Sequence, residues 1–288
     1  MNMTEGFSLI DNEESLSKLC NQLGNAAWLA VDTEFERVST YYPELCLVQI
    51  SNGITHAVID PLAIKNMEPL YDLLYQQSII KVLHSAHQDL ELLFNIKGSI
   101  PTPLFDTQIA APLFGYAQGI GYGNLVKEVL EIELDKGHAR TDWKKRPLSK
   151  DQLRYAVDDA VYLGKIYDVF KEKINKVENL HDFNAQINKL AKPETYQPDP
   201  ATMWKKIFAA KRLKGKQQII VKQLAAWREI TARERNRPRK WILADHAMIE
   251  MAKGSFENKS EFLKIDKVSE KLVSRHGDAL LKIIRDSQ

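Results

Sequence analysis

The stretch AVDTEFERVSTYYPEL (residues 30–45) begins with apolar residues and then carries a carboxylate at every second position, at Asp32, Glu34 and Glu36. In a β-strand, alternate side chains project from one face and lie about 6.6 Å apart. Like charges held side by side are unfavourable unless a divalent cation lies between them, and hard oxygen ligands suit Mg²⁺ or Mn²⁺. The stretch therefore predicts a strand whose polar face is either a metal site or a solvated acidic surface.

The Asp-x-Glu spacing alone is a weak signal, because it recurs at Asp11 and Glu13 in a polar stretch that suggests no site. Two other features accompany it. Asp89 follows an apolar strand and is expected in the first turn of a helix, where the helix dipole tolerates a carboxylate. Tyr155 and Asp159 are four residues apart and share one face of a helix. Each feature by itself is equally typical of ordinary surface residues.

Strand and helix patterns extend on both sides of the opening stretch. Apolar segments at 28–35, 45–51 and 55–60 are separated by short turn-prone sequences and predict antiparallel strands. From a fourth strand at 79–86 onward, strand and helix patterns alternate. This alternation predicts that the later strands pair in parallel, and it is typical of an α/β fold. The expected helices are residues 67–77, 88–98, 107–117, 124–134 and 149–176, the last with Ser149 as its N-cap.

The carboxyl-terminal third differs in composition. Residues 191–202 (AKPETYQPDPAT) contain three prolines without periodicity and predict a linker, and only helical patterns follow it. Residues 1–170 contain 14 Lys and Arg against 23 Asp and Glu, whereas residues 171–288 contain 26 against 15. This division predicts an acidic site in one domain and a polyanion-binding surface in the other, with two solvated surfaces as the alternative.

The overall composition limits the class of protein. The chain has 288 residues, of which 44% are apolar, enough for one large or two modest cores. No run approaches the roughly 20 apolar residues of a membrane span, and the amino terminus has no signal-peptide pattern. The two cysteines, Cys20 and Cys46, support neither a disulfide framework nor a zinc site. We therefore expect a cytoplasmic protein with no membrane association.

The strand D-x-E, the helix-start Asp and the helical Y-x-x-x-D together resemble the DEDDy 3′→5′ exonuclease superfamily. The flanking sequence is similar to the ribonuclease D family. The sequence motifs that carry this resemblance occur in order across nearly the whole amino-terminal domain. They are VDTEF (31–35), TYYPEL (40–45), LVQI (47–50), HSAHQDLELL (84–93), FDTQIAA (105–111), RTDWKKRPL (140–148) and YAVDDAVYL (155–163).

The resemblance also implies a domain organisation. Residues 221–252 look like the first helices of an HRDC domain, a helical nucleic-acid-binding module, although 265–273 lack the glycine that family members often have there. We expect an RNase H-like mixed sheet with flanking helices at 1–176, a Pro-rich helical connector at 177–212, and a small all-α HRDC-type domain at 213–288. Family members often carry a second such module, so we expect a weaker grip on structured RNA.

The resemblance assigns roles to the acidic residues. Asp32, Glu34, Asp89 and Asp159 would hold two Mg²⁺ or Mn²⁺ ions about 3.5–4 Å apart. Asp32 would bridge both ions, Glu34 and Asp159 would complete one site, and Asp89 would serve the other through water. Tyr155 would orient the attacking water by hydrogen bonding, in place of the histidine of the sister subfamily.

Two acidic neighbours fall outside this set. Asp158 lies one step, about 100° around the helix, from Asp159, and the family register favours Asp159. Glu36 continues the strand face beyond the motif, and we expect it to pair with a nearby base such as Arg37 or to remain in solvent.

A basic segment, KGHARTDWKKRPLSK (136–150), precedes the last catalytic helix. Basic side chains beside an aromatic ring suit a single-stranded 3′ end, whose phosphates attract cations and whose bases stack; a solvated charged loop is the alternative. A second candidate surface runs from Lys205 to Lys240, and we expect the nearby Trp227 and Trp241 to lie in the core of the small domain. The predicted RNA contacts of the basic segment are Lys136, Arg140, Trp143, Lys144, Lys145 and Arg146.

The leading hypothesis is a metal-dependent 3′→5′ exoribonuclease that releases 5′-mononucleotides from tRNA precursors and other small RNAs. A DNA exonuclease of proofreading or repair type is an alternative, because composition does not distinguish the two equally charged backbones. A binding protein that has lost catalysis is another, although all five site residues are present. The expected partner is RNA with a free 3′ end, and no feature indicates a stable protein partner.

Overall fold

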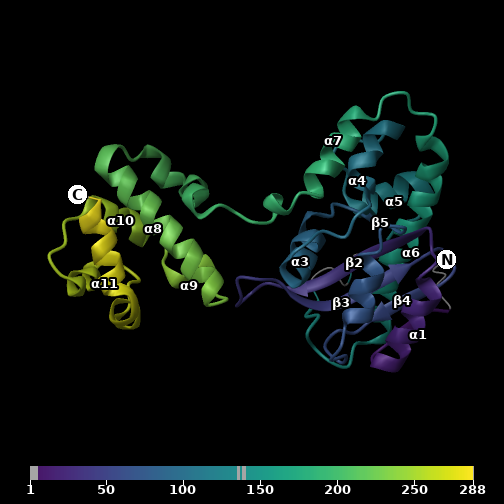
Figure 1. Ribbon diagram of the computed structural model, residues 1–288, viewed down its shortest axis with the longest axis horizontal. Coiled ribbons are helices and arrows are strands. Elements are labelled where there is room, and N and C mark those ends of the chain that lie inside the picture. The colour runs from purple at the N-terminus through teal and green to yellow at the C-terminus, as the bar shows by residue number, and fades with distance from the viewer. Residues whose placement is uncertain (1–5, 135–136, 138–140, 288) are drawn as a thin grey trace. The chain divides into compact units, whose positions relative to one another are not determined.

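The computed structural model describes residues 6–134, 137 and 141–287. Within these residues, six strands form one mixed sheet in the order β1-β4-β3-β2-β5-β6 (Figure 1). The strands are β1 (Ser8–Ile10), β2 (Trp28–Glu36), β3 (Glu44–Ser51), β4 (His56–Ile59), β5 (Ile80–Leu83) and β6 (Leu104–Asp106). The segment β2-β3-β4 is antiparallel, and β5 and β6 continue from β2 in parallel, so the predicted mixed α/β sheet is confirmed.

Helices cover both faces of the sheet, as the alternation of side chains along β2 requires. Leu29 and Val31 face a core shared with the helices that precede β6, and Trp28 and Ala30 face a core shared with those that follow it. These helices are α1 (Glu13–Leu23), α2 (Glu68–Leu74) and α3 (His87–Lys97), then α4 (Thr107–Ala110), α5 (Tyr122–Leu130), α6 (Lys150–Ile174) and α7 (His181–Leu190).

Two strands and one helix differ from the prediction. Strands β1 and β6 have only three residues each, too short for an alternating pattern to identify them. The predicted helix at 107–117 is interrupted: α4 ends at Ala110, a 3-10 turn (η1, Ala111–Phe114) follows, and Gly115 reverses the chain with a φ of 89°. Pro112 lies in this turn and lacks the N–H that a continuing helix would need.

Helix α6 is the longest element of the first unit, and its beginning is fixed by local chemistry. The Ser149 hydroxyl accepts a hydrogen bond from the Gln152 N–H, and the Gln152 side chain accepts one from the Ser149 N–H. This capping box satisfies N–H groups at the helix start and confirms Ser149 as the N-cap. Gly164, further along, lets the helix approach the Trp28 ring of β2.

The chain divides into two compact units, Met1–Glu36 with Glu44–Tyr196, and Arg37–Pro43 with Gln197–Gln288. The first unit extends past residue 176 because α7 packs on it: Phe183 is buried in the core that contains α6, and Tyr196 is buried against α3. This division places α7 and the turn η2 (Pro193–Thr195) with the exonuclease fold instead of in the expected connector.

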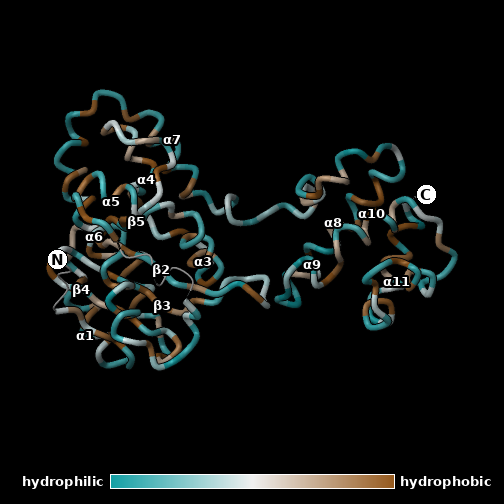
Figure 2. The backbone as a smooth tube through the Cα atoms, turned by 180° about the vertical axis from the view of Figure 1, so that it is seen from behind, coloured by the Kyte–Doolittle hydropathy of each residue, from teal (hydrophilic) through white to brown (hydrophobic). Residues whose placement is uncertain are grey.

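The second unit is all-helical around one buried core, with apolar residues recurring along α8 and α11 (Figure 2). Its elements are η3 (Pro200–Lys206), η4 (Phe208–Arg212), α8 (Gly215–Glu234), α9 (Arg239–Ile242), α10 (Asp245–Lys253), η5 (Lys259–Lys264) and α11 (Glu270–Asp286). Among the described residues, none of the helices is both long and apolar enough to cross a membrane.

The segment Arg37–Pro43, between β2 and β3, belongs to this second unit. The hydroxyl of the buried Tyr41 donates to Glu229 Oε1 (2.5 Å) and accepts from Arg239 Nη2 (2.9 Å). Asn236 Oδ1 accepts from the backbone N–H of Tyr41 (3.0 Å). The first four residues of the TYYPEL motif, 40–43, therefore belong to the helical unit, whereas Glu44 and Leu45 begin β3 of the first unit.

Candidate active site

Three carboxylates meet where β2 and α6 cross. Asp32 and Glu34 project from the face of β2 that α6 covers, and Asp159 comes from α6. One carboxylate oxygen from each lies within 4.8 Å of the others, and all three residues are half-buried. The group contains Asp159 and not Asp158, in agreement with the register that the family resemblance favours.

Asp89 approaches from the other side of the strand. It lies in the first turn of α3 and is buried, and its Oδ1 accepts a hydrogen bond from the Thr33 hydroxyl. Asp89 is not in the three-residue group, yet its charge raises the pKa of both Asp32 and Glu34, after the larger effect of burial. The fourth predicted acid thus lies within electrostatic reach of Asp32 and Glu34.

The acids disfavour one another's ionised forms. Burial and the neighbouring carboxylates raise the pKa of Glu34 to about 8 and that of Asp159 to about 8, and they raise the pKa of Asp32 well above its usual value. Burial also raises the pKa of Asp89, to about 6. The carboxylates of such a cluster are stable together in their ionised forms only when a cation compensates their charge.

Tyr155 lies one helical turn before Asp159. Its ring is half-buried and stacks on Trp143, with centroids 6.2 Å apart and planes at 28°. This contact restricts where the phenol can point. The predicted helical pair is therefore present, with the ring held by a tryptophan from the preceding segment.

Sequence reasoning missed two side chains at this site. His84 and Tyr122 line a cavity of about 90 Å³ together with Asp32, Asp159 and Leu163. His84 Nδ1 lies 2.9 Å from the Thr107 hydroxyl, whereas its Nε2 is buried with no hydrogen-bond partner among the described residues. In the sequence, His84 lies in the motif HSAHQD (84–89) and Tyr122 in the glycine-rich GIGYG (119–123), and neither motif specifies a distance to Asp32.

A buried aspartate outside the predicted set holds the turn between β5 and α3. Asp106 accepts hydrogen bonds from the N–H groups of Ser85 (3.1 Å) and Ala86 (2.8 Å), and it also caps α4. Ser85 has a φ of 57°, in the left-handed region that few residues with a side chain adopt. Asp106 thus stabilises the turn from which His84 and Asp89 emerge.

Several predicted RNA contacts have structural partners instead. Trp143 is only 5% exposed and packs in the core, so the prediction that it stacks on a base is wrong. Arg146 donates to both carboxylate oxygens of Asp60 (2.6 and 2.8 Å), which fixes it as a structural residue. Lys144 pairs with Glu36 (3.0 Å) and Glu44, so a base that Glu36 pairs with comes from the basic segment itself.

The remaining predicted contacts are of two kinds. Lys145 is exposed, as an RNA contact requires. Lys136 and Arg140 lie outside the described residues. The basic segment therefore retains one described candidate for binding the substrate.

Comparison with known proteins identifies both parts of the chain. Residues 7–175 match the 3'-5' exonuclease family, and residues 217–284 match the HRDC domain. A ribonuclease D from Pseudomonas paraeruginosa is 36% identical over 281 residues, which are 96% of this chain and 74% of that protein. The chain belongs to the ribonuclease D family of 3′-5′ exoribonucleases.

Solved structures agree with this membership. The crystal structure of Escherichia coli RNase D, described as an exoribonuclease involved in structured RNA processing, has a TM-score of 0.88 and 31% identity, covering 99% of this chain and 76% of that one. Brucella melitensis NrnC with bound Mg²⁺ has a TM-score of 0.55 and 28% identity, covering 68% and 92%. These relatives do not favour the DNA exonuclease or the silent binding protein.

The ribonuclease D fold implies divalent metal ions, and the residues present fit them. The donor set consists of hard carboxylate oxygens, which Mg²⁺ and Mn²⁺ both accept. The raised pKa values of Glu34 and Asp159 show that these acids need a compensating cation to be charged together at neutral pH. The candidate active site is therefore a carboxylate-lined metal centre.

Proposed function

We propose that this ribonuclease D family member removes 5′-mononucleotides from the 3′ ends of tRNA precursors and other small RNAs in the cytoplasm, with Mg²⁺ as its metal. The observation that carries the proposal is the convergence of Asp32 and Glu34 from β2 with Asp159 from α6. Two relatives support it: the E. coli protein is described as an exoribonuclease involved in structured RNA processing, and the Brucella protein has bound Mg²⁺.

Each acid would have a distinct role. Asp32 would bridge two ions, Glu34 and Asp159 would complete one site, and Asp89, held by Thr33, would serve the second through water. When bound, the ions lower the pKa of a water and stabilise the charge on the departing 3′-oxygen.

Tyr155 would place its hydroxyl against the attacking water, in an orientation that its stacking on Trp143 helps to fix. Tyr155 would act as a hydrogen-bonding group and not as a base, because the bound ions would already activate the water. Lys145 would attract the backbone of the substrate. The buried Trp143 would therefore position Tyr155 and would not itself contact RNA.

The test is turnover of three substrates of equal length: a 3′-extended tRNA, an unstructured RNA and a DNA. With Mg²⁺ we expect stepwise release of mononucleotides from the RNAs, and with chelator no release. Asp32→Asn should lower turnover at least 100-fold, because a bridging ligand is lost. Internal cleavage, or equal activity on DNA, would contradict the proposal.

A matched control is Asp11→Asn, because Asp11 and Glu13 repeat the Asp-x-Glu spacing on the surface. This variant should retain full turnover. Binding of RNA by Asp32→Asn in Ca²⁺ should persist, which separates a loss of chemistry from a loss of folding.

A further inference from the structure

Gln49 is a buried polar side chain that the proposed chemistry does not use. It lies in β3, within the LVQI motif (47–50), and is 0% exposed. Among the described residues, neither its amide nitrogen Nε2 nor its amide oxygen Oε1 has a hydrogen-bond partner. Leaving a buried donor and acceptor unpaired is unfavourable, so a folded protein that keeps such a group there calls for a reason.

The sheet places Gln49 beside Asp32. Strand β3 pairs antiparallel with β2, and in this register Gln49 is directly opposite Asp32. Directly opposed side chains project from the same face of a sheet, with their Cβ atoms about 4.5–5.5 Å apart. Helix α6 covers this face, on which Asp32, Glu34 and Asp159 meet. The amide of Gln49 is therefore within reach of the Asp32 carboxylate.

The other neighbours of Gln49 in the sheet offer its amide no partner. Val58, opposite Gln49 on β4, and Leu47, two residues earlier in β3, are apolar and pack with α6. The hydroxyl of Ser51, two residues later, already contacts a histidine ring (2.9 Å) and a backbone N–H (3.1 Å). Of the residues that flank Gln49 across and along the sheet, Asp32 is therefore the one whose side chain can accept a further hydrogen bond.

A neutral donor at this position suits the role proposed for Asp32. A carboxylate has about four lone-pair positions, so an acid that bridges two ions can still accept a hydrogen bond. Such a bond fixes the orientation of a metal-binding carboxylate and raises its affinity for the ion. The amide of Gln49 carries no charge, so it can hold Asp32 without repelling a cation, as a lysine or an arginine would.

We infer that Gln49 is a positioning residue of the metal centre: its Nε2 amide donates to the Asp32 carboxylate and holds it in the orientation that bridges the ions. The inference rests on the proposed function, since Gln49 acts through the role of Asp32. A purely structural glutamine would instead use its amide on other groups of the sheet, as Ser51 uses its hydroxyl.

The test is Gln49→Met, which nearly keeps the shape of the side chain and removes both amide atoms. Binding of Mn²⁺ to the full chain without RNA, measured from the EPR signal of the free ion, should weaken about tenfold. In chelator, the melting temperature of this variant should rise by about 2–4 °C, because two unpaired polar atoms leave the core. A more stable protein that binds metal more weakly is not the result of a purely structural role.

The matched control is Ser51→Ala, at a buried position on the same face of β3 whose hydroxyl is already hydrogen-bonded. It should leave the Mn²⁺ affinity within twofold of the wild type. Wild-type Mn²⁺ affinity in Gln49→Met would overturn the inference, as would an equal loss of affinity in the two variants.

A second measurement follows the amide of Gln49 in the wild type. In protein labelled with ¹⁵N in the glutamine side chains, the NMR signal of Gln49 is the one that Gln49→Asn removes. Adding Mg²⁺ should move this signal downfield, because the amide is unpaired in the structure and would gain an acceptor as the ions orient Asp32. A Gln49 signal that does not respond to Mg²⁺ would overturn the inference.

Failure of the proposed function gives a different result. A wild type that binds no Mn²⁺, or that does not hydrolyse RNA, contradicts the proposed function. A wild type that does both, alongside a Gln49→Met variant that binds Mn²⁺ equally well, contradicts only the role of Gln49.

Discussion

Thr33 lies between Asp32 and Glu34 but projects from the opposite face of β2, where its hydroxyl contacts the buried Asp89. One three-residue segment therefore supplies two carboxylates to one face and a hydrogen-bond donor to the fourth acid on the other. Because side chains alternate between the two faces of a strand, a short Asp-x-Glu motif can contact both other segments of the site.

Removing this hydroxyl should weaken metal binding. Thr33→Val keeps the shape of the side chain but leaves the Asp89 carboxylate without its donor. Supporting hydrogen bonds of this kind are typically worth 10- to 100-fold in metal affinity. We expect the Mg²⁺ concentration for half-maximal activity to rise about tenfold, with turnover at saturating Mg²⁺ little changed. Thr33→Ser, which retains the hydroxyl, should behave as the wild type; equal effects of the two variants would contradict this role.

The pKa values of the cluster predict how stability varies with pH in chelator. Folding raises the pKa of Glu34 and Asp159 to about 8 and that of Asp89 to about 6, whereas unfolded carboxyls titrate near 4. The folded state therefore binds more protons between these limits, and stability is lost as the pH rises from about 4 to about 8.

The free energy of unfolding, measured with urea in chelator, should fall between about pH 5 and pH 8 by at least 1.4 kcal/mol, roughly the equivalent of one pKa unit. Saturating Mg²⁺ should remove the fall, and Asp159→Asn should reduce it. Parallel pH curves in chelator and Mg²⁺ would show that the acids do not repel one another in the folded protein.

At the level of elements, α6 carries Tyr155 and Asp159 to the strand that carries Asp32, and its distance from the sheet is set at Gly164. A Cβ at this position would lie 2.9 Å from the Trp28 ring. Helix propensity and tertiary packing therefore make opposite predictions for an alanine here.

Gly164→Ala should destabilise the protein by about 1–2 kcal/mol in urea unfolding, because the buried indole has to move. In an unhindered helix the same change would stabilise by about 0.5–1 kcal/mol. Gly123→Ala is the matched control, since Gly123 lies in α5 with no atom within 4 Å of the added Cβ. A stabilised Gly164→Ala variant would show that α6 is not held this closely.

At the level of the whole molecule, acidic residues prevail in the part with the active site and basic residues in the rest. In the proposed function, the acids of the active site would attract metal and the basic surface would attract the phosphate backbone. We therefore expect substrates long enough to contact many basic groups to depend on salt much more strongly than short ones.

This difference can be measured as kcat/KM between about 50 and 200 mM salt. For a 12-nucleotide RNA with four or more phosphate contacts, kcat/KM should fall at least about tenfold, while for a dinucleotide with one phosphate it should fall about threefold at most. The same salt dependence for both substrates would contradict a separate basic binding surface.

The sequence by itself determined the strands and helices around the site, the acids Asp32, Glu34, Asp89 and Asp159, and the family. The elements follow from local periodicity and from the N-cap at Ser149. The acids and the family follow from sequence motifs that occur in order along the chain. It did not reveal the short strands β1 and β6, whose three residues carry no periodic signal.

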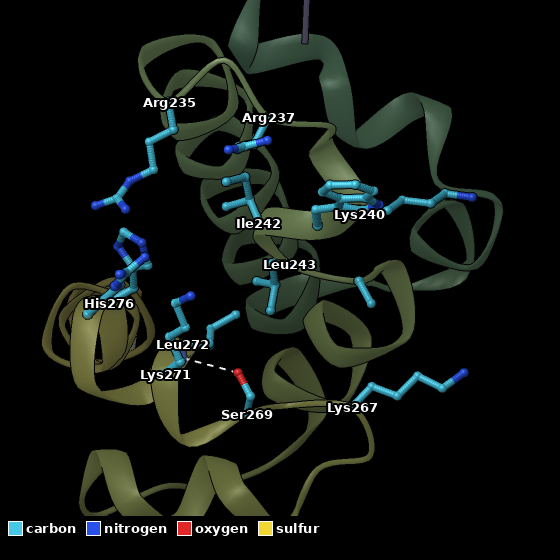
Figure 3. Close-up of a pocket in the computed structure, with 13 residues that line it drawn as sticks. Arg235, Arg237, Lys240, Ile242, Leu243, Lys267, Ser269, Lys271, Leu272 and His276 are labelled. Carbon is cyan, nitrogen blue, oxygen red and sulfur yellow. Dashed lines mark hydrogen bonds between the residues drawn. The ribbon is translucent and has the colours of Figure 1, made fainter. Parts of the chain in front are cut away.

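Only the tertiary structure decided which charges and rings are available. Lys144 neutralises Glu36 and Glu44 about one hundred residues away, Arg146 is fixed by Asp60, and Trp143 is buried against Tyr155. Trp227 packs against the core as predicted, whereas Trp241 is exposed, contrary to the prediction. Trp241 lines a pocket with Arg235, Lys240 and Lys271 (Figure 3). The physical reason is that burial and ion pairing depend on neighbours distant in the chain, which composition and spacing along the sequence do not specify.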